Sequence, residues 1–418
     1  MIKILVVNAG SSSLKYQLID MKAENLLAKG LVERIGISGT KVKHQAGSVK
    51  TEYETDLKNH TEALKEVTKL LLKGVNNVPS VIKSTEEVTA VGHRVVHAAE
   101  EFTGSVLIND KNLAVLEGIC DLAPLHQPPN IACIRAAVEV FPGKPQAAVF
   151  DTAFHSTIPQ KAYMYAIKYE DYAEHRVRRY GFHGTSHKYV SEVALKLLKN
   201  PKAKIITCHL GNGSSVTAVD AGKSVDTSMG FTPLEGLIMG TRSGDTDPAV
   251  VEYLMEKKRM TAKQVINYLN KESGFLGICG MSDNRDIVKA AHPLIDNGIP
   301  SEDMAKGQKG DPRAALAFDM NAYRIKKYIG AYAAAMGGLD AIVFTGGIGE
   351  NSWRNRRAVL DGMEFLGIKY NAYDENKNKQ LPPGNQEITE KGSKVRVFVI
   401  PTNEELVIAR ETKALIQA

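Results

Sequence analysis

Two short loops rich in glycine and serine constrain what this chain can fold into. The first occupies residues 8–15, directly after an apolar run, and the second occupies residues 209–215, after the apolar run 204–208. Each reads as a strand, a tight polar turn and a returning strand. Backbone N–H groups in such a turn converge on a common centre and form an anion cradle. Either loop alone could be an ordinary hairpin, because glycine and serine are common in turns. Their recurrence predicts two related halves that hold one polyphosphate, as a nucleotide clamp.

The composition is compatible with a two-domain globular protein. A chain of 418 residues exceeds what one hydrophobic core usually supports. The net charge of +6 comes from scattered basic residues, which argues against a nucleic-acid groove. The four cysteines lack CxxC spacing, so we expect reduced core residues. No apolar run has membrane length and the opening run is too short for a signal peptide, so we expect a soluble cytoplasmic protein with no membrane partner.

The apolar periodicity predicts strands and helices that alternate twice along the chain. We expect Asn130 to cap the helix that follows it. This order predicts an α/β fold built from two similar halves. The predicted strands are residues 2–7, 15–19, 26–32, 88–96, 146–151, 204–208, 341–345 and 395–400, and the predicted helices are residues 60–72, 113–122, 131–140, 186–199, 248–257, 261–273, 313–336, 354–366 and 403–416.

A third glycine loop lies at residues 345–351, between a predicted strand and a predicted helix. Glycines at such a junction let a flat ligand approach the backbone, and a helix N-terminus favours anions. The loop is not a dinucleotide-binding fingerprint, because no opening βαβ unit accompanies it. The Walker pattern GxxxxGK[ST] is also absent from the chain. We therefore interpret this loop as a nucleoside or phosphate contact.

Two arginines and several histidines lie in segments without the apolar spacing of a scaffold. Arg94 lies between two histidines at the end of a predicted strand, and Arg242 lies in the loop 239–248. The planar, permanently charged guanidinium suits phosphate and carboxylate, although a surface ion pair is the alternative. His183 precedes a predicted helix, where a capping or core histidine is the alternative. Zinc-binding spacings and a GxSxG serine are absent, which disfavours a zinc enzyme or a serine hydrolase.

Ten sequence runs resemble the acetate kinase family, in the family's order and from end to end of the chain. The family belongs to the superfamily of sugar kinases, actin and heat-shock chaperone ATPases. The resemblance implies two duplicated actin-like (ribonuclease H-like) domains, each a mixed five-stranded sheet flanked by helices, with an active-site cleft between them. It assigns residues 1–150 plus 385–418 to one domain and 151–384 to the nucleotide-binding domain. The runs are residues 8–15, 92–97, 123–130, 150–155, 179–187, 209–215, 239–248, 282–286, 345–351 and 401–406.

The resemblance also implies a reaction and a homodimer. The implied reaction is reversible transfer of the ATP γ-phosphoryl group to acetate, by direct in-line displacement, with Mg²⁺ or with Mn²⁺ in its place. Acetate with a pKa of roughly 4 to 5 is already ionised at neutral pH, so the reaction needs charge neutralisation rather than a general base. Asp151 is then expected to orient an arginine or a water molecule. The implied catalytic residues are Arg94, Asp151, His183 and Arg242; the acetate-site residues are Arg94, Val96, Leu125, His126, Phe182 and Pro233; the ATP-binding residues are Lys15, His209, Leu210, Gly211, Asn212, Gly213, Asp283, Asn284, Arg285, Gly347, Ile348, Gly349, Glu350 and Asn351; and the metal-site residues are Asn8 and Glu404.

Three alternatives stay open at the level of the sequence. A propionate or butyrate kinase would share the chemistry, because one methylene is worth only ~1–3 kcal/mol in an apolar pocket. Ala98 and Ala99 stand where the family usually has two glycines, which leaves the substrate size open. A non-catalytic, ATP-switched protein of the actin or chaperone kind would not need Arg94, His183 and Arg242 together. A sugar kinase would need a polar substrate site in place of the apolar residues.

Overall fold

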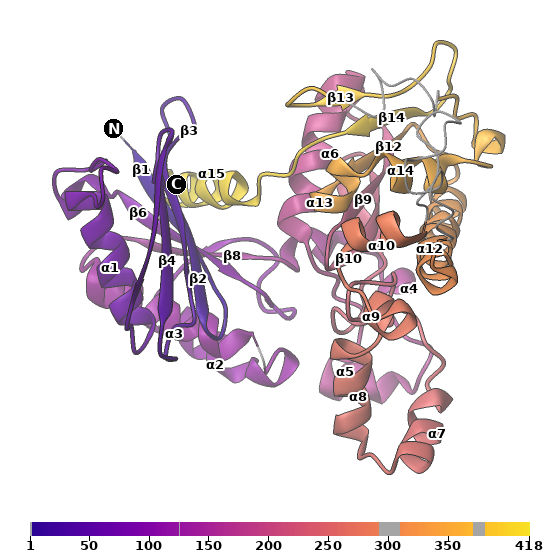
Figure 1. Cartoon of the computed structure of the whole chain (residues 1–418), viewed down its shortest axis with the longest axis horizontal. Coiled ribbons are helices and arrows are strands. Elements are labelled where there is room, and N and C mark those ends of the chain that lie inside the picture. The colour runs from indigo at the N-terminus through magenta and orange to yellow at the C-terminus, as the bar shows by residue number, and fades with distance from the viewer. Residues whose placement is uncertain (1, 125, 292–309, 371–380) are drawn as a thin grey trace. The chain divides into compact units, whose positions relative to one another are not determined.

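The chain forms two compact units. The structure, a computed structural model, describes residues 2–124, 126–291, 310–370 and 381–418 (Figure 1). Unit 1 comprises Met1–Ser156 and Asn403–Ala418, and unit 2 comprises Thr157–Thr402. The sequence placed the two crossings after residues 150 and 384. In the structure the second crossing comes later, because the strand near residue 398 pairs within the sheet of unit 2.

Both units are mixed sheets flanked by helices. Unit 1 contains β1 (Lys3–Ala9), β2 (Ser13–Asp20), β3 (Asn25–Glu33), β4 (Thr40–Ala46), β5 (Val49–Thr55), α1 (His60–Lys73), β6 (Ala90–Val95), β7 (Val106–Leu107), α2 (Asp110–Gly118), α3 (Gln127–Val140), β8 (Gln146–Phe150) and α15 (Glu404–Gln417). Unit 2 contains α4 (Gln160–Tyr163), α5 (Tyr169–His175), α6 (Gly184–Leu198), β9 (Lys204–Leu210), β10 (Ser214–Asp220), β11 (Lys223–Thr227), α7 (Ala249–Lys258), α8 (Ala262–Lys271), α9 (Gly274–Cys279), α10 (Asn284–Ala291), α12 (Pro312–Met336), β12 (Ala341–Thr345), α13 (Gly346–Asn351), α14 (Trp353–Leu360), β13 (Gln386–Glu387) and β14 (Arg396–Val399).

The two sheets share one strand pattern, which confirms the predicted duplication. The order is β5-β4-β3-β2-β1-β6-β8-β7 in unit 1 and β11-β10-β9-β12-β14-β13 in unit 2. In each sheet the first hairpin is antiparallel, and its first strand also pairs in parallel with a strand from much later in the chain. The five strands β3-β2-β1-β6-β8 therefore correspond to β11-β10-β9-β12-β14. Unit 1 extends this shared core with β4 and β5.

The two glycine and serine loops that we identified from the sequence are equivalent hairpin turns. The first joins β1 to β2 through residues 10–12, and the second joins β9 to β10 through residues 211–213. The Gly10 amide donates to the Ser13 carbonyl at 2.9 Å, and the Gly211 amide donates to Ser214 Oγ at 3.1 Å. In both turns the glycine amide therefore hydrogen-bonds to the residue three positions later.

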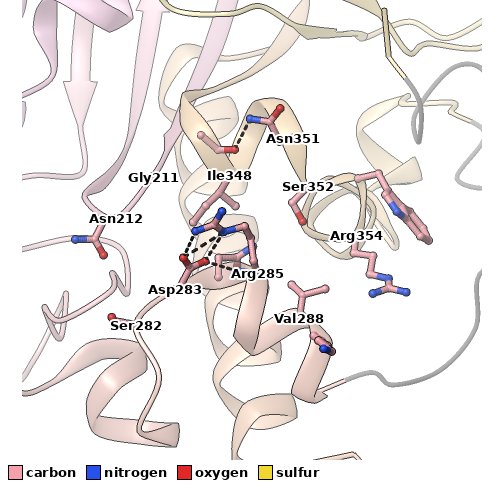
Figure 2. A pocket seen from close by; sticks show the side chains of 14 residues that line it. Gly211, Asn212, Ser282, Asp283, Arg285, Val288, Ile348, Asn351, Ser352 and Arg354 are labelled. Atoms are coloured by element: carbon pink, nitrogen blue, oxygen red, sulfur yellow. Dashed lines mark hydrogen bonds and ion pairs between the residues drawn. The ribbon is translucent and has the colours of Figure 1, made fainter. Parts of the chain in front are cut away.

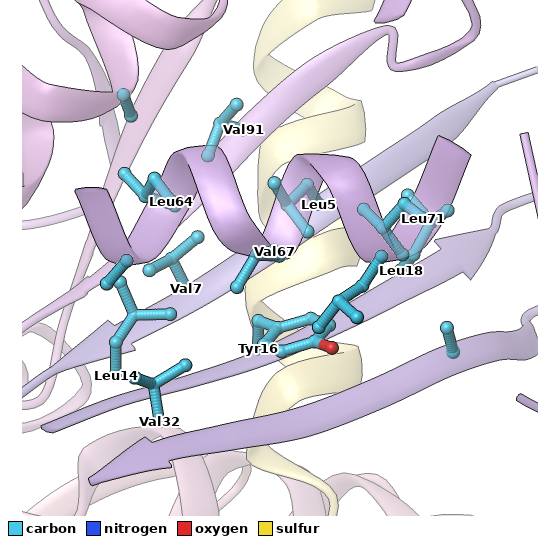
Figure 3. Close-up of a cluster of buried hydrophobic side chains, with 14 of the residues drawn as sticks. Leu5, Val7, Leu14, Tyr16, Leu18, Val32, Leu64, Val67, Leu71 and Val91 are labelled. Carbon is cyan, nitrogen blue, oxygen red and sulfur yellow. The ribbon is translucent and has the colours of Figure 1, made fainter. Parts of the chain in front are cut away.

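The core of unit 1 follows from the alternation of β1. Leu5 and Val7 are buried in the cluster that includes α1, whereas Ile4 and Val6 belong to the opposite cluster with α15. Figure 3 shows the side of the sheet that α1 covers, where Leu64, Val67 and Leu71 lie over the strands. These three residues recur at helical spacing and are fully buried. Each such burial contributes about 1.5–3 kcal/mol before conformational entropy is counted.

Unit 2 is built in the same way, around β9 and the long helix α12. Cys208 and Ile206 of β9 pack with Ile325 and Ile329 of α12, and α6 packs on β9 and β12. The helix α12 was predicted at residues 313–336 and is found at Pro312–Met336. It ends at Gly337, which is in the left-handed conformation that favours glycine.

The start of α3 corrects one prediction. Asn130 was expected to cap the helix, but α3 already begins at Gln127, because two prolines in its first turn need no intrahelical N–H partner. Asn130 instead lies within the helix and joins two strand ends. Its Nδ2 donates to the Ala9 carbonyl at 2.8 Å, and its Oδ1 accepts from the Val96 amide at 3.1 Å.

The expectation that the cysteines are core residues holds for two of the four. All four cysteines are free thiols; Cys133 and Cys208 are buried, whereas Cys120 and Cys279 are only half-buried. Among the described helices, none has the length and apolar character that crossing a bilayer requires.

Candidate active site

In unit 1, three candidate residues lie at the ends of three adjacent parallel strands. Asn8 is near the end of β1, Arg94 is near the end of β6, and Asp151 follows β8. Carboxyl ends of neighbouring parallel strands form the usual binding edge of an α/β sheet. Arg94 Nε lies 3.0 Å from Asp151 Oδ1, and Arg94 Nη2 lies 2.5 Å from Asp151 Oδ2. Arg94 Nη1 also lies 3.4 Å from Asn8 Oδ1.

In the Arg94–Asp151 pair, the carboxylate is the buried partner. Asp151 is 1% exposed, and burial raises the pKa of its carboxyl while the Arg94 guanidinium opposes that rise. The charge of Asp151 in turn raises the pKa of Arg94. A guanidinium held along one edge keeps its remaining N–H groups available for a planar anion.

The N-terminus of α15 brings two more carboxylates to this edge. Asn403 caps the helix by accepting from the Leu406 amide at 3.1 Å. The charge of Glu404 raises the pKa of Arg94 and of Asp151, so its carboxylate lies within electrostatic range of both. Glu405 forms an ion pair with Lys15, a predicted ATP contact that faces Asn8 across the β1–β2 hairpin. Within the described part of the chain, no group of three or more His, Cys, Asp or Glu side chains is arranged to hold a metal ion.

The other predicted residues of unit 1 lie around this strand edge. Val96 is half-buried one residue past β6, and His126 occupies the N-cap position of α3. Leu125, predicted to line the acetate site, lies outside the described residues. Ala98 and Ala99 are buried, and Ala99 has a left-handed backbone with φ 50°, the conformation that favours the family's glycine.

In unit 2, the second cradle brings two candidate catalytic residues together. A β-carbon at Gly213 would lie 3.5 Å from His183 Nε2 and 3.7 Å from Arg242 Nη1. The imidazole and the guanidinium therefore flank one glycine of the loop. Arg242 Nη1 also donates to the Pro233 carbonyl at 3.3 Å, and desolvation lowers the pKa of Arg242.

His183 is held by its ring neighbours. Its Nδ1 lies 2.9 Å from Ser215 Oγ, and its ring stacks on His209 with centroids 4.3 Å apart. His209, a predicted ATP contact, is fixed in turn by Ser186, whose Oγ lies 2.8 Å from His209 Nδ1. Phe182 is buried directly before His183.

A cavity in unit 2 is lined by most of the predicted ATP contacts. Its volume is ≈ 940 Å³, the size expected for a ligand as large as a nucleotide (Figure 2). The cradle contributes two residues to the lining, the start of α10 with the residue before it contributes three, and the third glycine loop contributes three. These predicted residues are Gly211, Asn212, Asp283, Asn284, Arg285, Gly347, Ile348 and Asn351.

Asp283 and Arg285 pair with each other at the wall of this cavity. Arg285 Nη2 lies 2.5 Å from Asp283 Oδ2, and the Asp283 carboxylate also accepts from the Arg285 amide at 2.8 Å. These hydrogen bonds lower the pKa of Asp283 to about 2. Figure 2 shows the pair in the cavity, beneath Ile348.

Two side-chain amides fix the cavity wall between α10 and α14. Asn284 Nδ2 donates to Asn355 Oδ1 at 3.0 Å, and Asn355 Nδ2 donates to Asn284 Oδ1 at 3.2 Å. This reciprocal pair joins the start of α10 to α14. Both side chains are buried, so Asn284 supports the cavity wall with its side chain.

The third glycine loop is fixed by its own glutamate. Glu350 Oε1 accepts from the Gly346 amide at 2.9 Å and from the Thr402 amide at 3.2 Å. Gly346 has φ +75°, and a β-carbon there would lie 2.7 Å from the Leu210 carbonyl, so the turn requires glycine. Leu210 itself is buried in the core of unit 2, and Gly349 is buried against the end of β12. Glu350, Leu210 and Gly349 were all predicted as ATP contacts.

The sequence reasoning missed several lining residues. Val288 and Lys289 lie three and four positions after Arg285 on α10, so helical spacing alone could have found them. Trp353 and Arg354 open α14, whose N-cap Ser352 follows the glycine loop. The missed lining residues are Ser282, Val288, Lys289, Ser352, Trp353 and Arg354.

Comparison with known proteins identifies one family over nearly the whole chain. A model of the acetokinase family matches residues 3–410. The chain is 52% identical over 417 residues to the acetate kinase of Clostridium acetobutylicum, covering 99% of each chain. It is 54% identical over 419 residues to the acetate kinase of Caldanaerobacter subterraneus, again covering 99% of each.

Solved structures agree over the whole length. The crystal structure of Porphyromonas gingivalis acetate kinase is similar with a TM-score of 0.89 and 44% identity, covering 100% of each chain. A propionate kinase from Francisella tularensis is similar with a TM-score of 0.86 and 40% identity, covering 99% of this chain and 100% of that one.

Proposed function

The chain belongs to the acetokinase family, and on that premise we propose that it is an acetate kinase. It transfers the γ-phosphoryl group of ATP to acetate, giving acetyl phosphate and ADP, and it runs in both directions. One observation carries this proposal beyond the family likeness. Gly211 and Asn212 line the large cavity, and the next residue, Gly213, lies against His183 and Arg242. A nucleotide in the cavity would therefore present its phosphates to an imidazole and a guanidinium.

The chemistry fits groups that position and neutralise charge. Acetate is ionised at neutral pH, so it attacks phosphorus without losing a proton. The barrier is the repulsion between two anions and the charge that spreads over the equatorial oxygens of the transferred group. Arg242 and His183 donate to those oxygens. Donors already in place cost no reorganisation during the reaction.

Arg94 and Asp151 of unit 1 are the groups that we propose for binding acetate. The Arg94 guanidinium binds the acetate carboxylate, because its planar fork matches two carboxylate oxygens. Asp151 fixes the guanidinium through the contacts at 3.0 Å and 2.5 Å, and takes no proton from acetate. Val96, Leu125, His126, Phe182 and Pro233 are the residues we propose for the acetate site.

Asn8 and Glu404 are suited to Mg²⁺ that retains most of its water. Both supply hard oxygen donors, and both lie within range of Arg94, by a contact at 3.4 Å for Asn8 and by charge for Glu404. Mg²⁺ binds through few protein oxygens and keeps several waters, so a large ligand cluster is not needed. When bound, the ion would neutralise charge on the phosphates of ATP. Mn²⁺ has a similar preference for oxygen and would substitute for it.

Propionate is the competing substrate. The Francisella tularensis relative is a propionate kinase, and one methylene changes binding by only ~1–3 kcal/mol. The acetate kinases among the curated relatives favour acetate for this chain. A homodimer in the cytoplasm, as the family resemblance implies, stays a prediction, and light scattering of the purified protein tests the dimer.

The test measures acyl phosphate directly. Purified protein is incubated with ATP, Mg²⁺ and hydroxylamine, together with acetate, propionate, butyrate or glycerol in turn. We expect hydroxamate with the carboxylates, the highest kcat/KM with acetate, and no ATP-dependent product with glycerol. The absence of hydroxamate with every carboxylate would refute the kinase assignment, and a higher kcat/KM with propionate would refute the choice of acetate.

A further inference from the structure

A chain of hydrogen bonds runs from His183 into the interior of unit 2. Ser215 Oγ lies 2.9 Å from His183 Nδ1 and 2.7 Å from His187 Nε2. His187 Nδ1 then lies 2.7 Å from Thr207 Oγ1. Ser215, His187 and Thr207 have no exposed surface. We call these three residues the His183 relay.

The protons of the relay can be arranged in two directions. A neutral imidazole has one N–H and one bare nitrogen, and a hydroxyl donates one hydrogen. In the inward-to-outward order, Thr207 donates to His187, His187 donates to Ser215, and Ser215 donates to His183 Nδ1. His183 then carries its single proton on Nε2. In the reverse order its proton is on Nδ1, and Nε2 is bare.

The geometry favours the inward-to-outward order. The reverse order requires the Thr207 hydroxyl to donate to the Thr217 carbonyl, which lies 3.5 Å away, at the limit of a hydrogen bond. In the favoured order the same hydroxyl donates to His187 Nδ1 at 2.7 Å. The favoured order therefore places the hydrogen in the shorter contact.

The nearby Arg242 guanidinium favours the neutral form of His183. His183 Nε2 and the Arg242 guanidinium both face Gly213, and His183 also stacks on His209 at 4.3 Å. A second positive charge beside Arg242 is disfavoured by like-charge repulsion. A neutral His183 can donate to a phosphoryl oxygen only from Nε2, which is the nitrogen that faces Gly213.

The backbone of His183 also indicates that the ring position is fixed. His183 has φ 57° and ψ 24°, a left-handed conformation at the start of α6. This conformation costs a residue with a β-carbon on the order of 1 kcal/mol, and such positions gather at functional sites. The contact with Ser215 and the stacking on His209 fix the direction in which Nε2 points.

We propose that Ser215 and His187 are positioning residues that keep His183 neutral, with its proton on Nε2, as a hydrogen-bond donor to the transferred phosphoryl group. This inference rests on the proposed function for the role of the donor. The protonation state itself does not depend on that function, so it can be measured separately.

The first experiment measures the protonation state in the full-length protein. Nitrogen NMR of protein labelled with ¹⁵N-histidine, with the His183 signals assigned by comparison with His183→Gln, distinguishes the two neutral forms and the imidazolium. At pH 7 we expect the Nε2–H form. A proton on Nδ1, or an imidazolium at pH 7, would overturn the proposal even if the kinase assignment is correct.

The second experiment measures turnover. Ser215→Ala should lower kcat roughly 10- to 100-fold, the range typical of hydrogen-bond partners that orient metal-binding histidines, with KM for ATP little changed. Ser215→Thr restores a hydroxyl and should recover most of the kcat. Ser191→Ala is the matched control, because Ser191 is a buried serine of α6 whose hydroxyl donates to the Lys188 carbonyl.

The outcomes separate the two proposals. Wild-type kcat and an unchanged pH profile in Ser215→Ala would overturn the role of the relay. A wild-type protein that forms no acyl phosphate refutes the proposed function instead, and the NMR measurement then decides the relay. If Ser215→Ala does not fold, the wild-type NMR spectrum and Ser215→Thr decide the question.

Discussion

Asp151 holds one edge of the Arg94 guanidinium, with Oδ1 3.0 Å from Nε and Oδ2 2.5 Å from Nη2. The acceptor is almost wholly buried and the arginine is partly exposed, with 26% of its side chain accessible. The pair therefore presents the rest of a fixed guanidinium outward. In this arrangement the carboxylate orients a substrate-binding group and has no need to accept a proton.

The first prediction concerns the charge of Asp151. Asp151→Asn keeps the shape but removes the charge that orients and neutralises Arg94, and it turns an amide N–H₂ toward the guanidinium. We expect kcat to fall by roughly 100-fold or more, since breaking a buried pair costs several kcal/mol. Hydroxamate formation under saturating substrates measures this. Asp20→Asn, at the half-buried end of β2, is the control and should keep wild-type kcat. Near-normal turnover of Asp151→Asn would remove any essential role for the charge.

The second prediction concerns the space beside Gly213. Gly213→Ala introduces a methyl group 3.5 Å from His183 Nε2 and 3.7 Å from Arg242 Nη1, ordinary contact distances that the fold tolerates. The methyl group would occupy the space where a phosphoryl oxygen should meet both donors. We expect the free energy of unfolding to change by less than about 1 kcal/mol and kcat to fall at least about tenfold.

Gly330→Ala is the control for that substitution. A β-carbon at Gly330 meets nothing within 4 Å, and the residue lies within α12. Alanine there should stabilise the protein by about 0.5–1 kcal/mol and leave kcat unchanged. Urea unfolding and the hydroxamate assay measure both variants, and an unaffected kcat in Gly213→Ala would contradict a phosphoryl position at this glycine.

The sequence predicted the parts of the fold that depend on local interactions better than the parts that depend on contacts between distant residues. Apolar periodicity located the main strands and helices, because period 2 and period 3.6 are local properties. The parallel pairing of β1 with β6, and of β9 with β12, follows from contacts distant in sequence. The start of α3 was missed because Asn130 was expected to be the cap, although the first turn of a helix accepts the two prolines that precede it.

In the candidate site, too, the sequence predicted single loops and residues but not the contacts between them. The glycine loops and Arg242 were identified because their composition is unusual for a scaffold. The pairing of Arg94 with Asp151 joins residues 57 positions apart, and the contact of His187 with Ser215 joins residues 28 positions apart. No spacing rule predicts such contacts. His187 was therefore given no role from the sequence.

The third prediction separates a structural glutamate from a nucleotide contact. Glu350→Ala leaves the Gly346 and Thr402 amides without the acceptor that they have now. We expect a loss of about 2–4 kcal/mol in the free energy of unfolding, because each unsatisfied buried group costs about 1–3 kcal/mol. Glu350→Gln keeps an acceptor oxygen and should lose about 1 kcal/mol or less.

Kinetics of the same variants give the second readout. If Glu350 acts through its own loop, Glu350→Gln should keep the wild-type KM for ATP. A KM raised tenfold in Glu350→Gln, with normal stability, would instead indicate a direct contact between the carboxylate and the nucleotide. Glu256→Ala, at an exposed position of α7, is the control for a lost surface carboxylate.

The fourth prediction is a dependence of stability on pH. His93 of β6 is 2% exposed, and its Nε2 lies 2.9 Å from Gln146 Oε1. Burial lowers the pKa of His93 to about 4 from its ordinary value near 6.5. The unfolded chain therefore binds a proton between about pH 6.5 and pH 4 that the folded chain does not. The contribution of His93 to stability is fully present above pH 6.5 and is lost as the pH falls toward 4.

The size of this effect can be measured against a variant that does not titrate. Between pH 7 and pH 5 the wild type should lose about 2 kcal/mol of unfolding free energy through His93, at 1.36 kcal/mol per pH unit below 6.5. His93→Gln keeps a donor for Gln146 and should lose correspondingly less over the same interval. His175→Gln, at an exposed position of α5, should behave like the wild type. Urea unfolding at the two pH values measures the difference, and equal losses in wild type and His93→Gln would mean that His93 is not the residue that makes the fold sensitive to acid.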